Sequence, residues 1–275
     1  MTMRPKMNSL ITAGLLILGM LGLAAVLAPF IMPHDPLGAN LLNRLKPPSF
    51  SYPLGTDHLG RCVFSRLLLG ARYTLCAGLL ASMGALFLGA LAGLTAGLAK
   101  PGLRGVMNIF MDVVLAFPGL VLALALTGVM GPSLFSLALA LAGAGWAWWG
   151  RFVRGLAVTA REKPYVKGGI VCGVRGGRLL RYYLLPQVLP STLVAASFKT
   201  GWMILGISGL SYLGLGAQPP IPEWGAMLQE SRLYLTRAPW LMLAPGTMVT
   251  LAVLGFNFLA EGLRDALEVR QAGEL

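Results

Sequence analysis

Two ionisable side chains, Asp112 and Lys199, lie inside apolar stretches of this sequence and are its first candidates for chemistry. Burying a charge in lipid costs several kcal/mol, so an ionisable residue in such a stretch is by default a functional hypothesis. We interpret both as candidates for lining or gating a pathway. Two alternatives stay open: Asp112 pairs with Lys100 or Arg104, and Lys199 extends its charged end toward the membrane surface.

A metal centre is a weaker interpretation. His34, His58 and Met203 carry side chains that can bind metals, but histidines in polar loops and methionines in apolar helices usually serve solvation or packing. They do not form a ligand cluster in the sequence, so we predict no metal site and keep Met203 as a pathway candidate. The cysteines show no metal-ligand spacing either, and we interpret all of them as free thiols: Cys62, Cys76 and Cys172.

The composition indicates an integral membrane protein. Of 275 residues, 56% are hydrophobic and only 12% are charged, whereas soluble chains carry about 25% charged residues. The net charge of +12 could suggest a nucleic-acid partner. However, the basic residues adjoin apolar runs and do not form one soluble face, so we interpret them as orientation signals and lipid contacts and predict no nucleic acid.

Six apolar runs predict an all-α fold with six transmembrane helices. The first run, 10–31, is longer than the core of a signal peptide. The first two runs are separated by the polar, proline-rich residues 32–72, with a short helix expected over 59–71. We divide the chain into an N-terminal helix and outer loop (1–72) and a five-helix core (73–275). The five core runs are 73–99, 106–130, 134–150, 189–216 and 241–261.

Residues 151–190 form a strongly basic stretch between two apolar runs. Its only acid is Glu162, and its cations are Arg151, Arg154, Arg161, Lys163, Lys167, Arg175, Arg178 and Arg181. Lysine and arginine resist translocation, so this stretch is predicted to be cytoplasmic. Counting runs from it places both termini in the cytoplasm as well. Residues 32–72 and 217–239 are then outside.

Helix-breaking residues divide the same stretch into two predicted short helices. Tyr165–Val171 reads as one helix, broken by the glycines at 173, 176 and 177, and Arg178–Leu185 reads as a second, stopped by Pro186 and Pro190. Two short helices presented to the cytoplasm by a membrane bundle indicate a docking element.

Three segments together resemble the permease subunits of ABC importers, in the dipeptide, oligopeptide and nickel branch. They are LGTDHLGRCVFSRLLLGARYTL (54–75), MDVVLAFPGLVLALAL (111–126) and GLSYLGLGAQPPIPEWGAML (209–228). The second carries an Asp-x-x-x-x-Phe-Pro pattern, which adds Phe117 and Pro118 to the gating candidates. Cys62 stands where the family usually has aspartate. The C-terminal segment FNFLAEGLRDALEVR (256–270) also resembles the family, with Val269 where proline is usual. The resemblance implies the bundle of a type I ABC importer permease.

The resemblance also gives the basic stretch a role as the loop that couples a permease to its ATPase. Lys167, Gly168 and Gly169 stand where Glu-Ala-Ala is typical. Val166 and Ile170, flanked by cations, are expected to seat in an acidic groove of the ATPase. The full set of coupling candidates is Tyr165, Val166, Lys167, Gly168, Gly169, Ile170, Gly173 and Arg175.

Contacts with an extracytoplasmic binding protein, or with the pathway mouth, are expected in the outer loops. Three prolines at 219, 220 and 222 stiffen the segment before Glu223 and Trp224, which we interpret as a rigid projection. Asp57, His58 and Arg61 in the first outer loop complete this set of candidates. A plain structural role is the alternative for Glu223 and Trp224.

The function implied by the resemblance is that of an inner-membrane permease subunit of a bacterial ABC importer. The expected partners are a second homologous permease, two ABC ATPases and an extracytoplasmic binding protein. The sequence has no nucleotide-binding loop, so ATP and Mg²⁺ belong to the ATPases, and we predict a transport subunit with no cofactor and no catalytic residue of its own.

The substrate is left between two classes. The run GWAWWGRFVR (145–154) is similar to the nickel members and favours nickel or a metal chelate, with dipeptides or oligopeptides as the alternative. An intramembrane enzyme would need a cluster of reactive side chains, and a channel would need rings of charge or a filter sequence. The sequence shows neither, and both rank below the importer.

Overall fold

All regular secondary structure in the described residues is helical, which confirms the predicted all-α class. The computed structural model describes the backbone of residues 4–272 and the side chains of residues 9–267. The α-helices in this part of the chain are α1 (Arg4–Ile31), α2 (Val63–Leu98), α3 (Pro101–Leu115), α4 (Gly119–Met130), α5 (Leu134–Arg161), α6 (Pro164–Val171), α7 (Gly176–Leu179), α8 (Leu185–Tyr212), α9 (Trp224–Ser231) and α10 (Trp240–Ala272).

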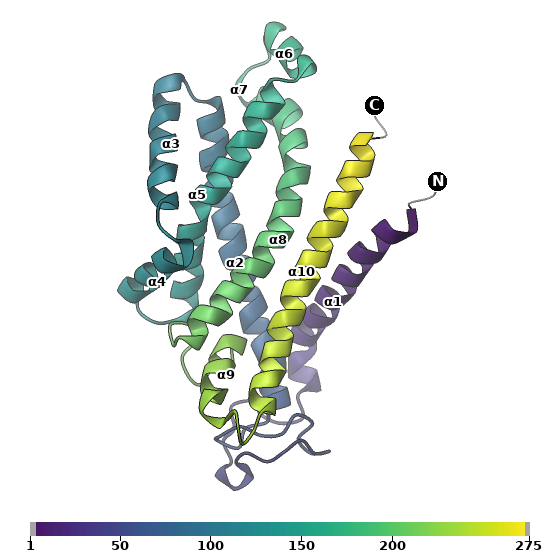
Figure 1. Ribbon diagram of the computed structural model, residues 1–275, viewed down its shortest axis with the longest axis vertical. Helices are drawn as coiled ribbons and strands as arrows, with labels where there is room; N and C mark the ends of the chain where they lie inside the picture. Colours follow the sequence, from purple (N-terminus) through teal and green to yellow (C-terminus); the bar gives the residue numbers. More distant parts are fainter. Residues whose placement is uncertain (1–3, 273–275) are drawn as a thin grey trace.

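The helices form an elongated bundle with two distinct ends (Figure 1). The antiparallel pair α1 and α10 lies along one side, α3 and α4 lie on the other, and α2, α5 and α8 pack between them. The short helices α6 and α7 lie at one end, which we call the α6 end. The start of α1 and the end of α10 lie toward the same end. Helix α9 and the loop 32–62 form the opposite end, the α9 end.

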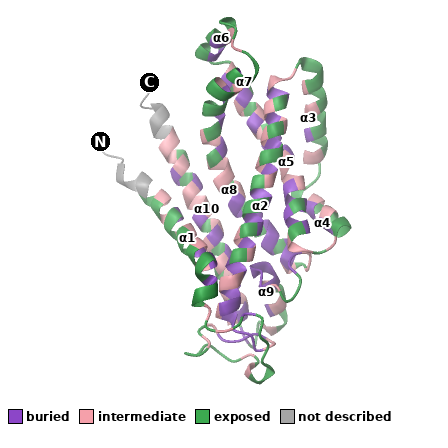
Figure 2. Ribbon diagram, turned by 180° about the vertical axis from the view of Figure 1, so that it is seen from behind, coloured by how far each residue is buried: buried purple, intermediate pink, exposed green. Residues whose placement is uncertain are grey.

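The most extensive helix contact joins α2 to α5, and glycines make it possible. A Cβ at Gly89 would overlap Cβ of Trp149 and the carbonyl oxygen of Trp146, and a Cβ at Gly93 would overlap the carbonyl oxygen of Gly150. Lipid offers no hydrophobic drive for helices to associate, so such close backbone approach supplies the van der Waals contact that holds them together. Figure 2 shows the resulting buried residues along α2 and α5.

The predicted count of six membrane spans is not confirmed. By length and hydropathy, four helical stretches of the described residues can cross a membrane: Ser9–Ile31, Val63–Leu98, Gly176–Tyr212 and Trp240–Leu267. Helices α3 and α4 together make a fifth if they count as one span, although they are bent by 85°. The predicted span 134–150 belongs to α5. This helix continues to Arg161 and so carries basic side chains in its second half.

Three predicted boundaries are wrong, each for a local reason. The expected helix at 59–71 and the span at 73–99 form one continuous helix, α2. The predicted span 106–130 is broken at 116–118, because Pro118 lacks an N–H and its ring disfavours helical geometry at Phe117. Pro186 and Pro190 do not stop a helix. The π-helical segment Leu180–Leu184 shifts the hydrogen-bond register directly before them, and the chain continues into α8.

The glycine contacts of α2 predict a sharp difference between two substitutions. Gly89→Ala should lower the free energy of unfolding by about 1–3 kcal/mol, because the methyl group must displace α5. Gly105→Ala on α3, where a Cβ meets no atom within 4 Å, is the matched control and should be neutral or stabilising by up to about 1 kcal/mol. Thermal unfolding of the purified protein measures both, and equal unfolding temperatures would refute the packing argument.

Candidate functional site

Within the basic stretch 151–190, the short helix α6 projects from one end of the bundle (Figures 1 and 2). Helix α6 begins at Pro164, a residue well suited to the first turn of a helix. It is followed by Gly173 with φ of +87°, a conformation that glycine adopts at little cost. The predicted helix over 165–171 is thus confirmed, with one additional residue at its start.

One face of α6 is buried within this chain. Val166 is fully buried against Ala160 of α5 and against Leu179 and Leu184, which lead into α8. Gly169 lies against the ring of Tyr183, where a Cβ would come within 2.8 Å of a ring carbon. The expectation that Val166 seats in a groove of another protein is therefore contradicted, because its side chain joins α6 to α5 and α8.

The opposite face of α6 is open to solvent. It carries Tyr165, which is 48% exposed, and Val171, which is 87% exposed. Gly168 and Cys172 are exposed beside them. We call Tyr165, Gly168, Val171 and Cys172 the outer face of α6. Val171 is not among the coupling candidates predicted from the sequence, because helical spacing defines two faces of α6 and does not say which one the rest of the chain covers.

The remaining coupling candidates differ in their surroundings. Lys167 pairs with Glu162 at 2.6 Å, but both side chains are more than half exposed, so the pair contributes little to stability. The hydrogen bond and charge of Lys167 hold the pKa of the Glu162 carboxyl below its usual value. Ile170 is partly buried beside Val166. Gly173 and Arg175 are exposed.

A second feature is a cavity of about 340 Å³ beside the break between α3 and α4. Non-helical backbone at membrane depth is tolerated where it lines a cavity or is buried in protein, and the break supplies part of the wall. Helices α5 and α8 supply the rest. The lining residues are Val114, Leu115, Phe117, Pro118, Gly119, Leu141, Ala144, Gly145, Trp148, Trp149, Lys199, Trp202 and Met203.

Lys199 is the charged residue of this cavity. Its Nζ lies 4.0 Å from the ring centroid of Trp148 and 5.4 Å from that of Trp202. Such cation–π contacts are worth about 0.5–2 kcal/mol, less than an ion pair in the same place could supply. Among residues 9–267, no hydrogen-bond acceptor or carboxylate contacts the ammonium. Lys199 is thus held by aromatic faces and has no counter-charge in this part of the chain.

Four of the five predicted pathway residues meet at this cavity, and the fifth does not. Phe117, Pro118, Lys199 and Met203 all line it, although they are far apart in the sequence. Asp112 instead pairs with Arg151 of α5 at 2.9 Å, with both side chains about half exposed. The expected pairing of Asp112 with Lys100 or Arg104 is wrong, since the guanidinium of Arg104 donates to the carbonyl of Ala99.

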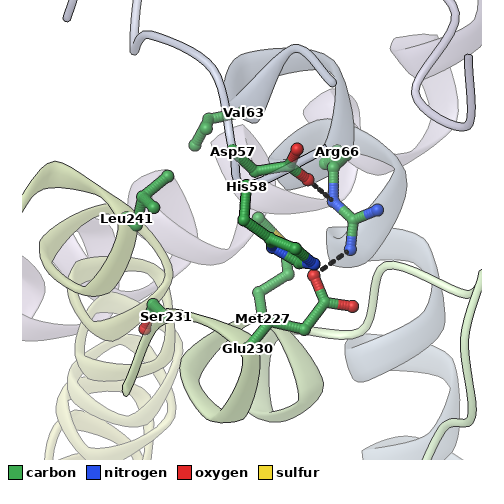
Figure 3. A pocket seen from close by; sticks show the side chains of 8 residues that line it. All are labelled: Asp57, His58, Val63, Arg66, Met227, Glu230, Ser231 and Leu241. Carbon is green, nitrogen blue, oxygen red and sulfur yellow. Dashed lines mark hydrogen bonds and ion pairs between the residues drawn. The ribbon is translucent and has the colours of Figure 1, made fainter. Parts of the chain in front are cut away.

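At the α9 end, the expected contact residues Asp57 and Arg61 belong to a buried ionic network. Figure 3 shows its other members, Arg66 and Glu230, together with Asp57. Arg61 Nε donates to Asp57 Oδ2 at 2.6 Å, and Arg61 Nη2 donates to Glu230 Oε2 at 2.9 Å. Arg66 Nη2 reaches the same Glu230 oxygen at 2.9 Å, and its Nε lies 3.6 Å from Asp57 Oδ2. The two acids and two arginines balance in charge, so the loop is tied to α2 and α9. Asp57 and Arg61 are too buried to contact another protein.

His58 lies at the edge of this ionic network. Its ring stacks on Tyr234 with centroids 5.5 Å apart, and burial lowers the pKa of its imidazole, while Asp57 and Glu230 oppose that shift. Ligand atoms of Asp57, His58 and Glu230 lie within 4.8 Å of one another. Both carboxylates, however, are already bonded to guanidinium groups, and a divalent cation would have to displace them.

Glu223 and Trp224 are fully buried, so the expectation of an exposed projection is wrong. Glu223 caps α9, accepting hydrogen bonds from the N–H groups of Gly225 and Ala226 at 2.9 Å and from the Thr74 hydroxyl at 3.0 Å. Trp224 Nε1 donates to the carbonyl of Leu67 at 3.1 Å. These bonds fasten α9 onto α2, which is the structural alternative that the sequence left open.

Comparison with known proteins shows which protein family has this architecture. Residues 67–273 match the family described as "Binding-protein-dependent transport system inner membrane component". The chain belongs to this family. Residues 4–48 match the N-terminal transmembrane domain of oligopeptide transport permease C. Members are transport subunits, and ATP hydrolysis is carried out by separate ATPase subunits, so this permease is not an enzyme.

Relatives of this permease serve several substrates. It is 39% identical to a dipeptide transport system permease of Alkalihalophilus pseudofirmus over 96% of this chain and 86% of the relative. It is 36% identical to the nickel transport system permease of Escherichia coli K12 over 92% of each chain. A solved amino acid ABC transporter matches 71% of this chain and 91% of its own with a TM-score of 0.58; at 18% identity, it supports the fold alone.

The burial of Glu223 predicts a pH dependence of stability. Burial raises the pKa of this carboxyl above its ordinary value near 4.5, so on raising the pH the unfolded chain releases this proton before the folded chain does. The contribution of Glu223 is therefore full below the ordinary pKa and declines as the pH rises through the folded pKa. The stability of Glu223→Gln relative to the original protein should increase over that interval.

Thermal unfolding between mildly acidic and neutral pH measures this difference. Glu261→Gln, which removes an exposed carboxyl on α10, is the matched control. A pH-independent difference between the original protein and Glu223→Gln would show that the carboxyl is ionised equally in both states.

Proposed function

We propose that this permease forms one half of the translocation pathway of an ATP-driven importer for short peptides. A homologous permease would form the other half, two ABC ATPases would bind at the α6 end, and an extracytoplasmic binding protein would deliver substrate at the α9 end. The α6 end and both termini would then face the cytoplasm, consistent with the cations of residues 151–181. The membrane would be the bacterial inner membrane, as the family description indicates.

The two-part division of the chain is part of this proposal. Residues 1–72 would serve as an N-terminal helix and outer loop, and residues 73–275 as the permease core with its coupling loop at 151–190. The separate matches over residues 4–48 and 67–273 support such a division. Its boundary lies inside α2, because that helix begins at Val63.

The cavity beside the α3–α4 break is the observation that favours peptides. Its lining is aromatic and apolar with a single cation, and it contains no carboxylate, histidine or cysteine. A bare Ni²⁺ ion would meet Lys199 and no ligand except the weak thioether of Met203. The run 145–154 that favoured nickel serves packing in part, since Trp149 is fully buried and Trp148 stacks on Phe152. Nickel carried as an anionic chelate is the second candidate.

The packing around α6 supports a coupling route. Val166 links α6 to Ala160 of α5 and to Leu184, the residue directly before α8, and both α5 and α8 line the cavity. Movement of an ATPase against the outer face of α6 would therefore move two walls of the cavity together. This is the rigid-body coupling that alternating access requires.

The substrate proposal is tested with the complete transporter in liposomes. Short dipeptides, NiCl₂ and a citrate chelate of nickel are added in turn with the cognate binding protein, and the rate of ATP hydrolysis is measured. Dipeptides should raise the rate above its basal level, and NiCl₂ should not. Stimulation by nickel species alone would reject the peptide proposal.

The coupling proposal is tested by cross-linking from two faces of α6. In a background with serine at positions 76 and 172, Val171→Cys should cross-link to an ATPase subunit, because its side chain lies on the outer face of α6. Val166→Cys is the matched control and should not react, because it is buried inside this chain. Transport without any cross-link from position 171, or equal cross-linking from both positions, would contradict the assignment.

A further inference from the structure

We propose that Lys199 binds a carboxylate of the substrate inside the cavity between the α3–α4 break, α5 and α8. This inference rests on the proposed importer function and adds the residue and the chemical group that it recognises. Its basis is an ammonium group that lines a cavity of about 340 Å³ and has no counter-charge in the described part of the chain.

The state of Lys199, unpaired among the described residues, contrasts with that of the paired acids and arginines described above. Asp57, Arg61, Arg66 and Glu230 neutralise one another, as described above. Asp112 is paired with Arg151 at the surface. Lys199 lies midway along α8, a helix long and apolar enough to cross the membrane. Placing an ionisable group at this depth costs free energy, so a lysine without a counter-charge in the described residues indicates a ligand that supplies one.

The tryptophans around Lys199 hold its charged end toward the cavity. The Nζ lies over the Trp148 ring of α5 and near the Trp202 ring of its own helix. Both rings also line the cavity, so the ammonium is presented at its wall and not at the membrane surface. The alternative that Lys199 extends along its helix to the surface does not account for these two contacts.

The cavity fits a carboxylate carried on a small, largely apolar body. Its volume falls in the range of small-molecule sites, about 300–1,000 Å³. One ammonium supplies donors for one carboxylate, and the surrounding aromatic and aliphatic side chains suit the apolar part of a short peptide. The C-terminal carboxylate of a peptide and the carboxylates of a citrate chelate share this chemistry, whereas a free metal cation is repelled.

A neighbouring groove gives the cavity a connection along α8. This groove, about 470 Å³, lies between α4 and α8 and is lined by Leu120, Leu205 and Leu213 among other apolar residues. It shares Trp202 with the cavity. Helix α8 runs from the α6 end to the α9 end (Figure 1). The residues of this part of the chain that line the groove, Trp202 to Leu213, follow Lys199, so the groove lies on the side of Lys199 that faces the α9 end, where delivery is proposed.

The test is direct binding to the assembled permease–ATPase complex in lipid nanodiscs, without the binding protein, so that the selectivity of that protein does not enter. The probes are dialanine and dialanine amide, which differ only in the terminal carboxylate. Lys199→Met should weaken dialanine binding about tenfold or more, as expected for one charge-assisted hydrogen bond, and leave the amide unchanged. Lys199→Arg, which keeps the cation, should retain binding within about threefold.

The matched control is Lys46→Met, which removes an exposed lysine of the loop 32–62 and should change neither probe. Equal weakening of both probes by Lys199→Met, no effect on either, or no binding of dialanine to the unaltered complex at millimolar concentration would each overturn the inference. Loss of the second permease from the Lys199→Met complex, but not from Lys199→Arg, would also overturn it, because Lys199 would then pair with that subunit.

The inference and the proposed function can fail separately. If dipeptides stimulate ATP hydrolysis while the Lys199 variants bind both probes as the original does, the function stands and the role of Lys199 falls. If dipeptides neither stimulate nor bind, and the citrate chelate of nickel binds in a Lys199-dependent way, the peptide function falls and recognition of a carboxylate stands.

Discussion

The close packing of α2 on α5 is the contact on which the rest of this structure depends. Gly89 and Gly93 let the two backbones approach until the tryptophan-rich segment of α5 lies directly against α2. In lipid, such contact replaces the hydrophobic drive of a soluble core. It holds α5 in place, and α5 carries both the cavity wall at Trp148 and, twelve residues further along the chain, the Ala160 contact with α6.

The charged residues at the α9 end are paired with one another, whereas Lys199 in the cavity has no counter-charge among the described residues. At the α9 end, Arg61 and Arg66 compensate Asp57 and Glu230 where both guanidinium groups are nearly inaccessible to water, so removing any one of the four would leave a buried charge unpaired. Together with the Glu223 cap, this network fastens the loop 32–62 and α9 onto α2. Lys199 is different, because its ammonium lines a cavity and lies against aromatic rings.

The break between α3 and α4 has a local cause, but its role depends on how other helices pack beside it. Pro118 breaks the helix through its covalent geometry, although the predicted span 106–130 ran through this position. Its use depends on α8, since Met203 and Lys199 bring the opposite wall of the cavity to within reach of Phe117 and Pro118. The same holds at α6, where Gly173 ends the helix by its backbone conformation while Tyr183 and Val166 decide which face is covered.

The sequence by itself determined the membrane class, the importer-permease family and the short helix at 165–171. These follow from composition, motifs and backbone chemistry, all of which are local. It could not show that Glu223 and Trp224 are buried, that Asp112 pairs with Arg151, or that Val171 and not Val166 faces outward. In a membrane chain both the lipid-facing and the core-facing sides of a helix are apolar, so hydropathy does not distinguish them. Contacts such as Arg61 with Glu230, 169 residues apart, arise only when the folded helices bring distant charges together.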